Sequence, residues 1–280
     1  MAKGMFVDTS ICTGCKACQV ACKAWNGLDP EPKHFKSDPD THLLASNFTG
    51  NSYDNTGELS ATDWRHVRFI EQFNEERAGS RWLFASDSCK HCTDAGCINV
   101  CPVGAITRTE LGTVVIRQDK CRGIRACNKG CPYGVARYSE KSHTSRKCTF
   151  CNDRIHNGLG TACAKACPTG SIRFGELSEL KVIADARLVH LKALGETKHN
   201  IYGYTEAKGL NVFYLLIDKP SVYGLPENPI VPQRPKSFPP ISGPLDVLTA
   251  GLAAIVGSRD SIIKEEKVEG IDDDRSDEHN

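Results

Sequence analysis

Alternating polar and apolar positions between residues 63 and 85 predict a β-hairpin. Residues 63–73 read DWRHVRFIEQF, a pattern typical of a strand that buries one face. Residues 81–85, RWLFA, provide a matching partner strand. Shorter β-branched or alternating runs predict further strands at 105–108, 112–117 and 171–175.

The pattern changes after residue 175. Residues 211–217, NVFYLLI, form a continuous apolar run that predicts a buried strand. Residues 220–244 contain eight prolines and predict an extended strap, while residues 264–280 carry eight acidic and three basic residues and predict a solvated tail. A helix is predicted over 176–195, where Leu180, Ile183, Ala184, Ala186, Val189, Leu191 and Leu194 fall near helical spacing.

Cysteine usage divides the chain into two regions. All 15 cysteines of the 280 residues lie between Cys12 and Cys167. An extracellular disulfide scaffold is disfavoured because the chain is long, the count is odd, and the first residues lack the apolar core of a signal peptide. Thiolates held by metal are the better interpretation.

The cysteines form four sets with ligand-like spacing. The second and fourth sets end in a CP-x-G-x-I motif, in which proline ends a helix and glycine permits the turn into a strand. The sets are Cys12, Cys15, Cys18, Cys22; Cys89, Cys92, Cys97, Cys101; Cys121, Cys127, Cys131; and Cys148, Cys151, Cys163, Cys167.

This spacing indicates iron–sulfur clusters in preference to zinc. Zinc explains paired C-x2-C motifs but leaves the regular third and fourth cysteines without a role. In two-cluster ferredoxins the last cysteine of one run ligates the cluster of the partner run, so we pair the first set with the fourth and the second with the third. The predicted ligands are Cys12, Cys15, Cys18 and Cys167 for cluster 1; Cys148, Cys151, Cys163 and Cys22 for cluster 2; Cys89, Cys92, Cys97 and Cys131 for cluster 3; and Cys121, Cys127 and Cys101 for cluster 4.

Cluster 4 lacks one predicted ligand. Ile124 occupies the position where the spacing requires a fourth cysteine. A [3Fe-4S] cluster needs only three thiolates and is the simplest consequence, beside three complete [4Fe-4S] clusters. A [4Fe-4S] cluster with a water-bound or otherwise ligated iron, and a loop that never held metal, are the alternatives.

The charge distribution fits clusters better than nucleic acid. The whole chain carries a net charge of +1, but residues 89–173 contain 14 Lys or Arg against five Asp or Glu. Thiolate-ligated clusters are anionic, so a basic surrounding compensates them, and no nucleic-acid-binding motif is present. We expect Lys16, Lys90 and Lys165 to raise cluster potentials. His91 and His156 lie close to candidate ligands in sequence; we expect ordinary exposed loop residues, with hydrogen-bond donors to the ligands or proton relays as the alternative.

At this point the chain resembles a known family. The cysteine sets resemble those of electron-transfer subunits of molybdopterin oxidoreductases. Residues 12–26 (CTGCKACQVACKAWN), 53–64 (YDNTGELSATDW), 89–97 (CKHCTDAGC) and 223–229 (YGLPENP) are similar to the iron–sulfur β subunit of respiratory formate dehydrogenase. The resemblance covers roughly residues 5–230.

The resemblance implies an electron relay. A catalytic subunit with a molybdenum or tungsten bis-pterin would supply electrons near clusters 1 and 2, and a membrane subunit that reduces quinone would accept them near cluster 4. The same role for a polysulfide, tetrathionate, dimethyl sulfoxide or nitrate reductase is the alternative. A stand-alone enzyme that uses an open cluster iron as a Lewis acid is a further hypothesis from another class.

Two departures from the formate members bear on the partner. Those members usually have cysteine at the position of Ile124, whereas nitrate reductase β subunits have an aromatic residue there and a [3Fe-4S] cluster. Formate members also continue into a transmembrane helix, but the apolar run at 243–258 is too short for one. We therefore expect no transmembrane helix and attachment to the membrane through partners, on either the periplasmic side, by co-export, or the cytoplasmic side.

The predicted fold class is α+β, with two intertwined ferredoxin-like dicluster units. One unit comprises residues 1–22 and 146–175, and the other comprises residues 89–145. A cysteine-free insertion spans 23–88, a partner-binding region spans 176–244, and a short apolar segment with the acidic tail spans 245–280.

Overall fold

The computed structural model describes residues 2–29, 35–37, 44–46, 53–54, 56–73 and 79–234. The apolar segment and acidic tail predicted for 245–280, the last ten residues of the strap, and parts of the insertion lie outside these residues.

A four-stranded sheet joins the two ends of the described chain. Its order is β10 (Ile172–Glu176), β1 (Lys3–Asp8), β12 (Val212–Leu216) and β11 (Asn200–Tyr202). β1 is antiparallel to β10 and parallel to β12, and β11 is antiparallel to β12. Every residue of β12 is buried, so the buried strand predicted from the apolar run is confirmed.

Helix α6 (Leu177–Ala193) covers one face of this sheet, as the helical spacing predicts. Leu180 and Ala184 pack against Phe6 and Phe213, whose rings stack with centroids 5.4 Å apart.

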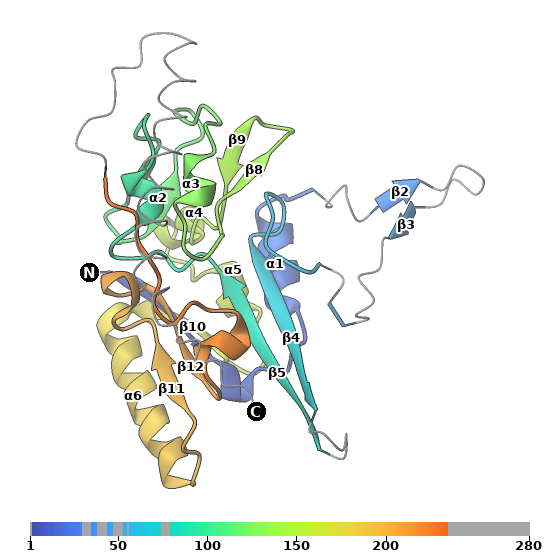
Figure 1. Ribbon diagram of the computed structural model, residues 1–280, viewed down its shortest axis with the longest axis vertical. Coiled ribbons are helices and arrows are strands. Elements are labelled where there is room, and N and C mark those ends of the chain that lie inside the picture. The colour runs from blue at the N-terminus through green and yellow to red at the C-terminus, as the bar shows by residue number, and fades with distance from the viewer. Residues whose placement is uncertain are drawn as a thin grey trace, which may run out of the picture.

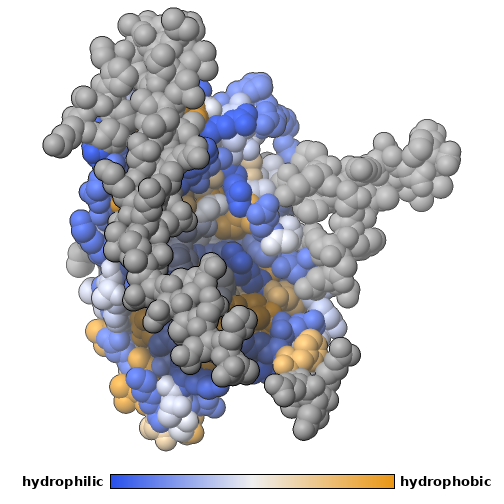
Figure 2. All heavy atoms as spheres, in the orientation of Figure 1, coloured by the Kyte–Doolittle hydropathy of each residue, from blue (hydrophilic) through white to orange (hydrophobic). Residues whose placement is uncertain are grey.

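The predicted apolar face of α6 is only partly right. Val189 and Leu194 are 69% and 67% exposed, and Ile183 is also exposed. Figure 2 shows hydrophobic surface at the lower left edge, where α6 lies in Figure 1. The helix carries apolar residues on most of its circumference, whereas the sheet contacts a single side of it.

The opposite face of the sheet packs against a long hairpin. β4 (Arg65–Phe73) and β5 (Ser80–Ser88) pair antiparallel, which confirms the predicted hairpin. Val67 and Leu83 of the hairpin join Met5 and Tyr214 of the sheet in one buried cluster. α1 (Ala17–Trp25) contacts β4, so the first cysteine set lies beside the hairpin.

Short elements support the remaining cysteine loops. The predicted strands at 105–108 and 112–117 are confirmed as a pair, β6 and β7. Figure 1 shows α2, α3, β8 and β9 at the end of the molecule away from α6. These elements are α2 (Gly96–Asn99), β6 (Ile106–Arg108), β7 (Val114–Ile116), α3 (Ala126–Lys129), β8 (Arg137–Ser139), β9 (Thr144–Arg146), α4 (Asn152–His156) and α5 (Ala162–Lys165).

Three further observations complete the fold. β2 (Phe35–Ser37) pairs with β3 (Leu44–Ser46). The predicted strap is not extended at its start, because Pro220–Tyr223 forms a 3-10 turn. This turn buries Tyr223 in the same cluster as Met5 and Tyr214, and residues 224–234 then continue without helix or strand. Within the described ranges, no helix has the length and apolar character needed to cross a membrane.

Candidate metal centres

The thiols of the first and fourth sets gather into two groups. Burial raises the pKa of Cys22, and the nearby thiols of Cys148, Cys163 and Cys151 add to this effect. The pKa of Cys12 is likewise raised by burial and by the thiols of Cys18 and Cys167. Cys22 of the first set therefore lies near thiols of the fourth set, and Cys167 of the fourth set lies near thiols of the first.

The second and third sets behave in the same way. Burial raises the pKa of Cys97, with contributions from the thiols of Cys131, Cys89 and Cys92. Burial also raises the pKa of Cys127 to about 11, with contributions from the thiols of Cys101 and Cys121 and a smaller one from Cys131. Cys131 of the third set thus lies near thiols of the second set, and Cys101 of the second set lies near thiols of the third.

The four groups follow one another in space. Cys18 of the first group is close enough to Cys163 of the second for their charges to interact. Cys148 of the second group interacts in the same way with Cys89 of the third. Cys127 of the fourth group interacts with Cys131 of the third. The order along the molecule is therefore first, second, third, fourth.

The cysteine loops share one backbone device. In each loop, the residue just before the second ligand position has a positive φ: Gly14 (+68°), His91 (+48°), Gly123 (+66°) and Phe150 (+62°). This left-handed turn is natural for glycine and unfavourable for other residues. Its presence in all four loops shows that residues 121–124 retain the shape of a ligand loop although Ile124 replaces a cysteine.

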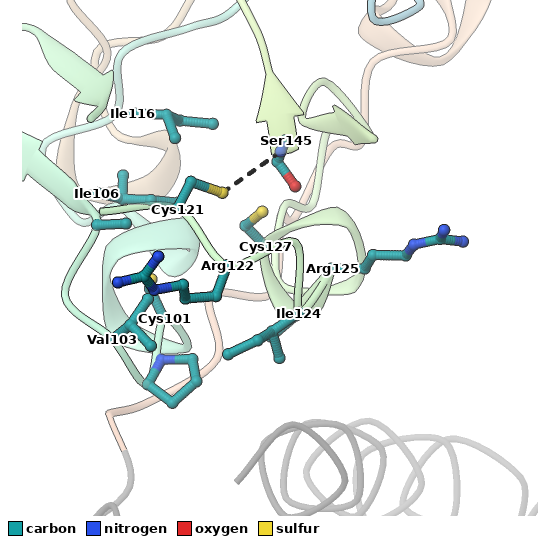
Figure 3. A pocket seen from close by; sticks show the side chains of 13 residues that line it. Cys101, Val103, Ile106, Ile116, Cys121, Arg122, Ile124, Arg125, Cys127 and Ser145 are labelled. Carbon is teal, nitrogen blue, oxygen red and sulfur yellow. Dashed lines mark hydrogen bonds between the residues drawn. The ribbon is translucent and has the colours of Figure 1, made fainter. Parts of the chain in front are cut away.

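A pocket of about 310 Å³ lies at the fourth group. Figure 3 shows Cys121 and Cys127 between Ser145 on one side and Ile124 on the other. The backbone N–H of Ser145 donates to Cys121 Sγ over 3.4 Å. Arg122 and Arg125 also line the pocket, but its lining includes neither carboxylate nor histidine. No general base for the Lewis-acid hypothesis is therefore present in its wall.

The surroundings of the thiols fit iron–sulfur clusters. Backbone N–H groups of Val135 and Phe150 donate to the sulfurs of Cys131 and Cys148, at 3.5 and 3.3 Å. Hydrogen bonds of this kind favour the anionic thiolate that a cluster requires. Within the described residues, no three His, Cys, Asp or Glu side chains converge closely enough to hold a single ion. A cluster binds its thiolates through different irons and does not need that convergence.

Sequence reasoning does not identify Asn26 as a hydrogen-bond donor to a candidate ligand, but the structure places it beside Cys22. Its Nδ2 atom lies 3.7 Å from Cys22 Sγ and 2.8 Å from the Cys22 carbonyl. Its position one turn after Cys22 on α1 is the sequence signal for this contact.

The two histidines near the cysteines differ. His156 is exposed as expected and pairs with Glu110, but it is the last residue of α4 and does not lie in a loop. For His91 the expectation of exposure is wrong, because its side chain is fully buried against Phe150. His91 Nδ1 accepts from the Val114 N–H, so in neutral His91 the proton lies on Nε2, which is buried without a hydrogen-bond partner. An N–H without an acceptor in this position fits a cluster sulfur nearby.

The three lysines that we expect to raise cluster potentials have different surroundings. Lys16 lies 3.9 Å from the carboxylate of Asp54, and Lys165 is exposed. Lys90 is fully buried but pairs with Asp87. Sequence reasoning missed Arg65 and Lys147, which are buried near the thiols.

Comparison with known proteins agrees with these centres. Two models of the 4Fe-4S dicluster domain match the chain, over residues 11–105 and 80–177. The formate dehydrogenase-O iron–sulfur subunit of Escherichia coli (strain K12) is 37% identical over 243 residues, which cover 85% of this chain and 76% of that protein. The chain belongs to this family of iron–sulfur electron-transfer subunits.

Two other members show the breadth of the family. The iron–sulfur subunit of the nitrate-inducible formate dehydrogenase of E. coli (strain K12) is 35% identical over 227 residues, covering 80% of this subunit and 72% of that protein. The B subunit of the anaerobic dimethyl sulfoxide reductase of the same strain is 35% identical over 155 residues, covering 55% of this subunit and 64% of that protein. This α+β subunit is therefore an electron-transfer protein with several iron–sulfur clusters.

Proposed function

We propose that this subunit relays electrons between a molybdenum or tungsten bis-pterin catalytic subunit of the formate dehydrogenase type and a membrane subunit that reduces quinone. The observation that carries the proposal is the spatial order of the four thiol groups, in which each group adjoins the next. When bound, an iron–sulfur cluster supplies one-electron transfer, and the protein supplies its position, burial and hydrogen bonds.

We assign the ligands by the thiol groups. Cluster 1 uses Cys12, Cys15, Cys18 and Cys167; cluster 2 uses Cys148, Cys151, Cys163 and Cys22; cluster 3 uses Cys89, Cys92, Cys97 and Cys131. Cluster 4 uses Cys121, Cys127 and Cys101. We take the two dicluster units, at 1–22 with 146–175 and at 89–145, as intertwined because the second interrupts the first in sequence. Residues 23–88 are then an insertion and residues 176–244 a partner-binding region.

We assign a [3Fe-4S] cluster to the fourth position. Support comes from the loop at 121–124, which keeps the left-handed turn of the other ligand loops but presents Ile124 in place of a thiol. Three thiols line the pocket there, and they match the three ligands of such a cluster.

The partners follow the family. The relatives named as formate dehydrogenase subunits support a formate-oxidising catalytic partner. The subunit is held at the membrane by its partners, on the periplasmic side after co-export or on the cytoplasmic side, and the segment at 241–258 contributes to docking on a partner subunit.

The test is purification of the native complex without oxygen, followed by mass spectrometry of its subunits. Formate is then added while the visible absorbance is recorded. Bleaching in the presence of a pterin-containing partner is the expected result. If the complex contains an active catalytic partner but formate leaves its visible absorbance unchanged, the formate assignment is wrong.

Dimethyl sulfoxide reduction is the second candidate, because the B subunit of that reductase is also similar. In that case formate leaves the absorbance unchanged, and dimethyl sulfoxide restores the colour of the chemically reduced complex. Re-oxidation by polysulfide, tetrathionate or nitrate would assign the same relay to another reductase.

A further inference from the structure

Arg65 is a fully buried cation beside the second thiol group. It begins β4, and only 1% of it is exposed. Its side chain lines a pocket of about 280 Å³ together with Cys22, Cys148 and Cys163. Arginine keeps its proton in proteins, so a full positive charge lies in this wall.

The hydrogen-bond partners of Arg65 are all uncharged. Nη1 donates to Ser86 Oγ over 2.8 Å, and Nη2 donates to Ser88 Oγ over 3.0 Å and to Met5 Sδ over 3.2 Å. Within the described part of the chain, no carboxylate forms an ion pair with it. A buried charge without a counter-charge is strongly destabilising, so the arrangement requires an anion nearby.

Neighbouring buried or half-buried cations differ in this respect. Arg68, three residues further along β4, donates to Asp87 from both Nε and Nη2. Lys90 pairs with the same carboxylate. Arg65 therefore lacks the carboxylate partner that these two neighbouring cations have. Lys147, the other buried cation near the thiols, also has no carboxylate partner among the described residues, but it donates to the Val114 and Cys148 carbonyls beside other thiols.

Ser86 connects Arg65 to the first thiol group as well. Its hydroxyl accepts from Arg65, which leaves its own hydrogen free for Cys18 Sγ, 3.2 Å away. The positive charge thus polarises a hydrogen bond to a ligand of cluster 1, while the guanidinium itself lines the pocket of cluster 2.

We propose that Arg65 is the shared counter-charge of clusters 1 and 2 and sets the midpoint potentials of both. The inference rests on the proposed ligand assignment. Reduction adds one electron to a cluster that is already anionic, and a fixed cation in a low-dielectric wall stabilises the reduced form more than the oxidised form. No proton accompanies the electron, because Arg65 remains protonated in both states. Ser86 is a positioning residue that carries part of the effect to cluster 1.

The test compares the native complex with four single variants in anaerobic redox titrations monitored by EPR. Arg65→Met should shift the reduction equilibria of clusters 1 and 2 toward the oxidised form by at least tenfold, which is 59 mV for a one-electron couple. Arg65→Lys should remain closer to the native potentials. Ser86→Ala should shift cluster 1 alone, and Arg68→Met, the matched control on the same strand, should shift neither.

Iron content decides between the remaining outcomes. Arg65→Met with full iron and unchanged potentials overturns the proposal. If Arg65→Met loses iron while Arg65→Lys retains it, the requirement for positive charge is supported. If both Arg65 variants lose iron, Ser86→Ala decides. An unchanged midpoint potential of cluster 1 in Ser86→Ala overturns the proposal, and a shifted midpoint potential supports it. A native chain without clusters at the first two thiol groups would instead contradict the proposed ligand assignment.

Discussion

Gly123 repeats the backbone conformation of Gly14. Their φ angles are +66° and +68°, and each glycine precedes the second ligand position of its loop. That position holds Cys15 in one loop and Ile124 in the other. The loop at 121–124 therefore has the left-handed turn of the other cysteine loops but no thiol at this position, and introduction of a thiol there is a direct test of the proposed fourth cluster.

Replacement of Ile124 by cysteine should complete the fourth cluster. Oxidised [3Fe-4S] clusters are paramagnetic and oxidised [4Fe-4S] clusters are not, so the EPR signal of the oxidised native protein should disappear in Ile124→Cys. The iron content should rise by one atom per chain. Ile124→Val, which adds no thiol, serves as control and should keep the signal. Absence of the signal from intact anaerobic native protein would argue for a [4Fe-4S] cluster at this position.

A side chain at Gly123 should damage the fourth cluster selectively. A Cβ atom there would collide with the carbonyl oxygen of His143, in addition to the roughly 1–2 kcal/mol of left-handed strain. Gly134→Ala is a matched control, because Gly134 has a similar φ of +60° but its nearest neighbour would lie 3.9 Å away. We expect Gly123→Ala to lose most of the fourth cluster's EPR signal. Equal losses of the EPR signal in Gly123→Ala and Gly134→Ala would show that left-handed strain alone causes the damage, and not the close approach to His143.

Removal of iron should loosen the start of the hairpin. Without an anionic cluster, Arg65 is a buried charge with only neutral partners, a situation that destabilises by about 3–5 kcal/mol. Chelation should therefore increase amide hydrogen exchange at the beginning of β4 and the end of β5. In Arg65→Met the increase should be smaller, because no charge is stranded. A native chain whose hairpin protection survives chelation would contradict this expectation.

The chain without iron should also lose stability at high pH. Burial raises the pKa of Cys127 to about 11 and that of Cys148 to about 12, from an ordinary value of 9.0. As the pH rises through 9, thiols in the unfolded chain lose protons first, so the free energy of unfolding falls by about 1.4 kcal/mol per pH unit for each such thiol.

Urea unfolding between pH 8 and 10 measures this effect. The midpoint of the iron-free chain should fall over this range, whereas the loaded protein should show no matching slope because its ligands are already thiolates. A constant or rising midpoint in the iron-free chain would contradict the thiol pKa values.

Much of the fold follows from local sequence patterns. The hairpin β4 and β5, the strands after the CP-x-G-x-I motifs and the buried strand β12 are each marked by alternation or by an unbroken apolar run. The parallel pairing of β1 with β12 has no such mark, because it joins distant segments through backbone hydrogen bonds. The crossed ligand assignment is a prediction from the ferredoxin rule applied to the spacing, and the proximity of Cys22 to the fourth set and of Cys131 to the second supports it.

Arg65 shows why part of the site escapes sequence reasoning. Alternation places Arg65 on the face of Val67 and Phe69 and Arg68 on the opposite face, but a charged residue in a strand is normally assigned to solvent, so the pattern does not predict the burial of Arg65. Their difference depends on what lies across the hairpin: the Asp87 carboxylate for Arg68, and hydroxyls and thiols for Arg65. His91 is similar, because its burial depends on packing against Phe150, which lies far away in sequence.

The position of β1 between β10 and β12 has a consequence for biogenesis. β1 leaves the ribosome early, but its neighbours begin at residues 172 and 212. At 5–20 residues per second, the ribosome needs roughly 10–40 s to make the sheet complete. During that interval the N-terminal thiols have neither their sheet nor their distant partners. Under the proposed ligand assignment, iron insertion into the first two centres follows translation of most of the chain, and the cell must keep these thiols reduced until then.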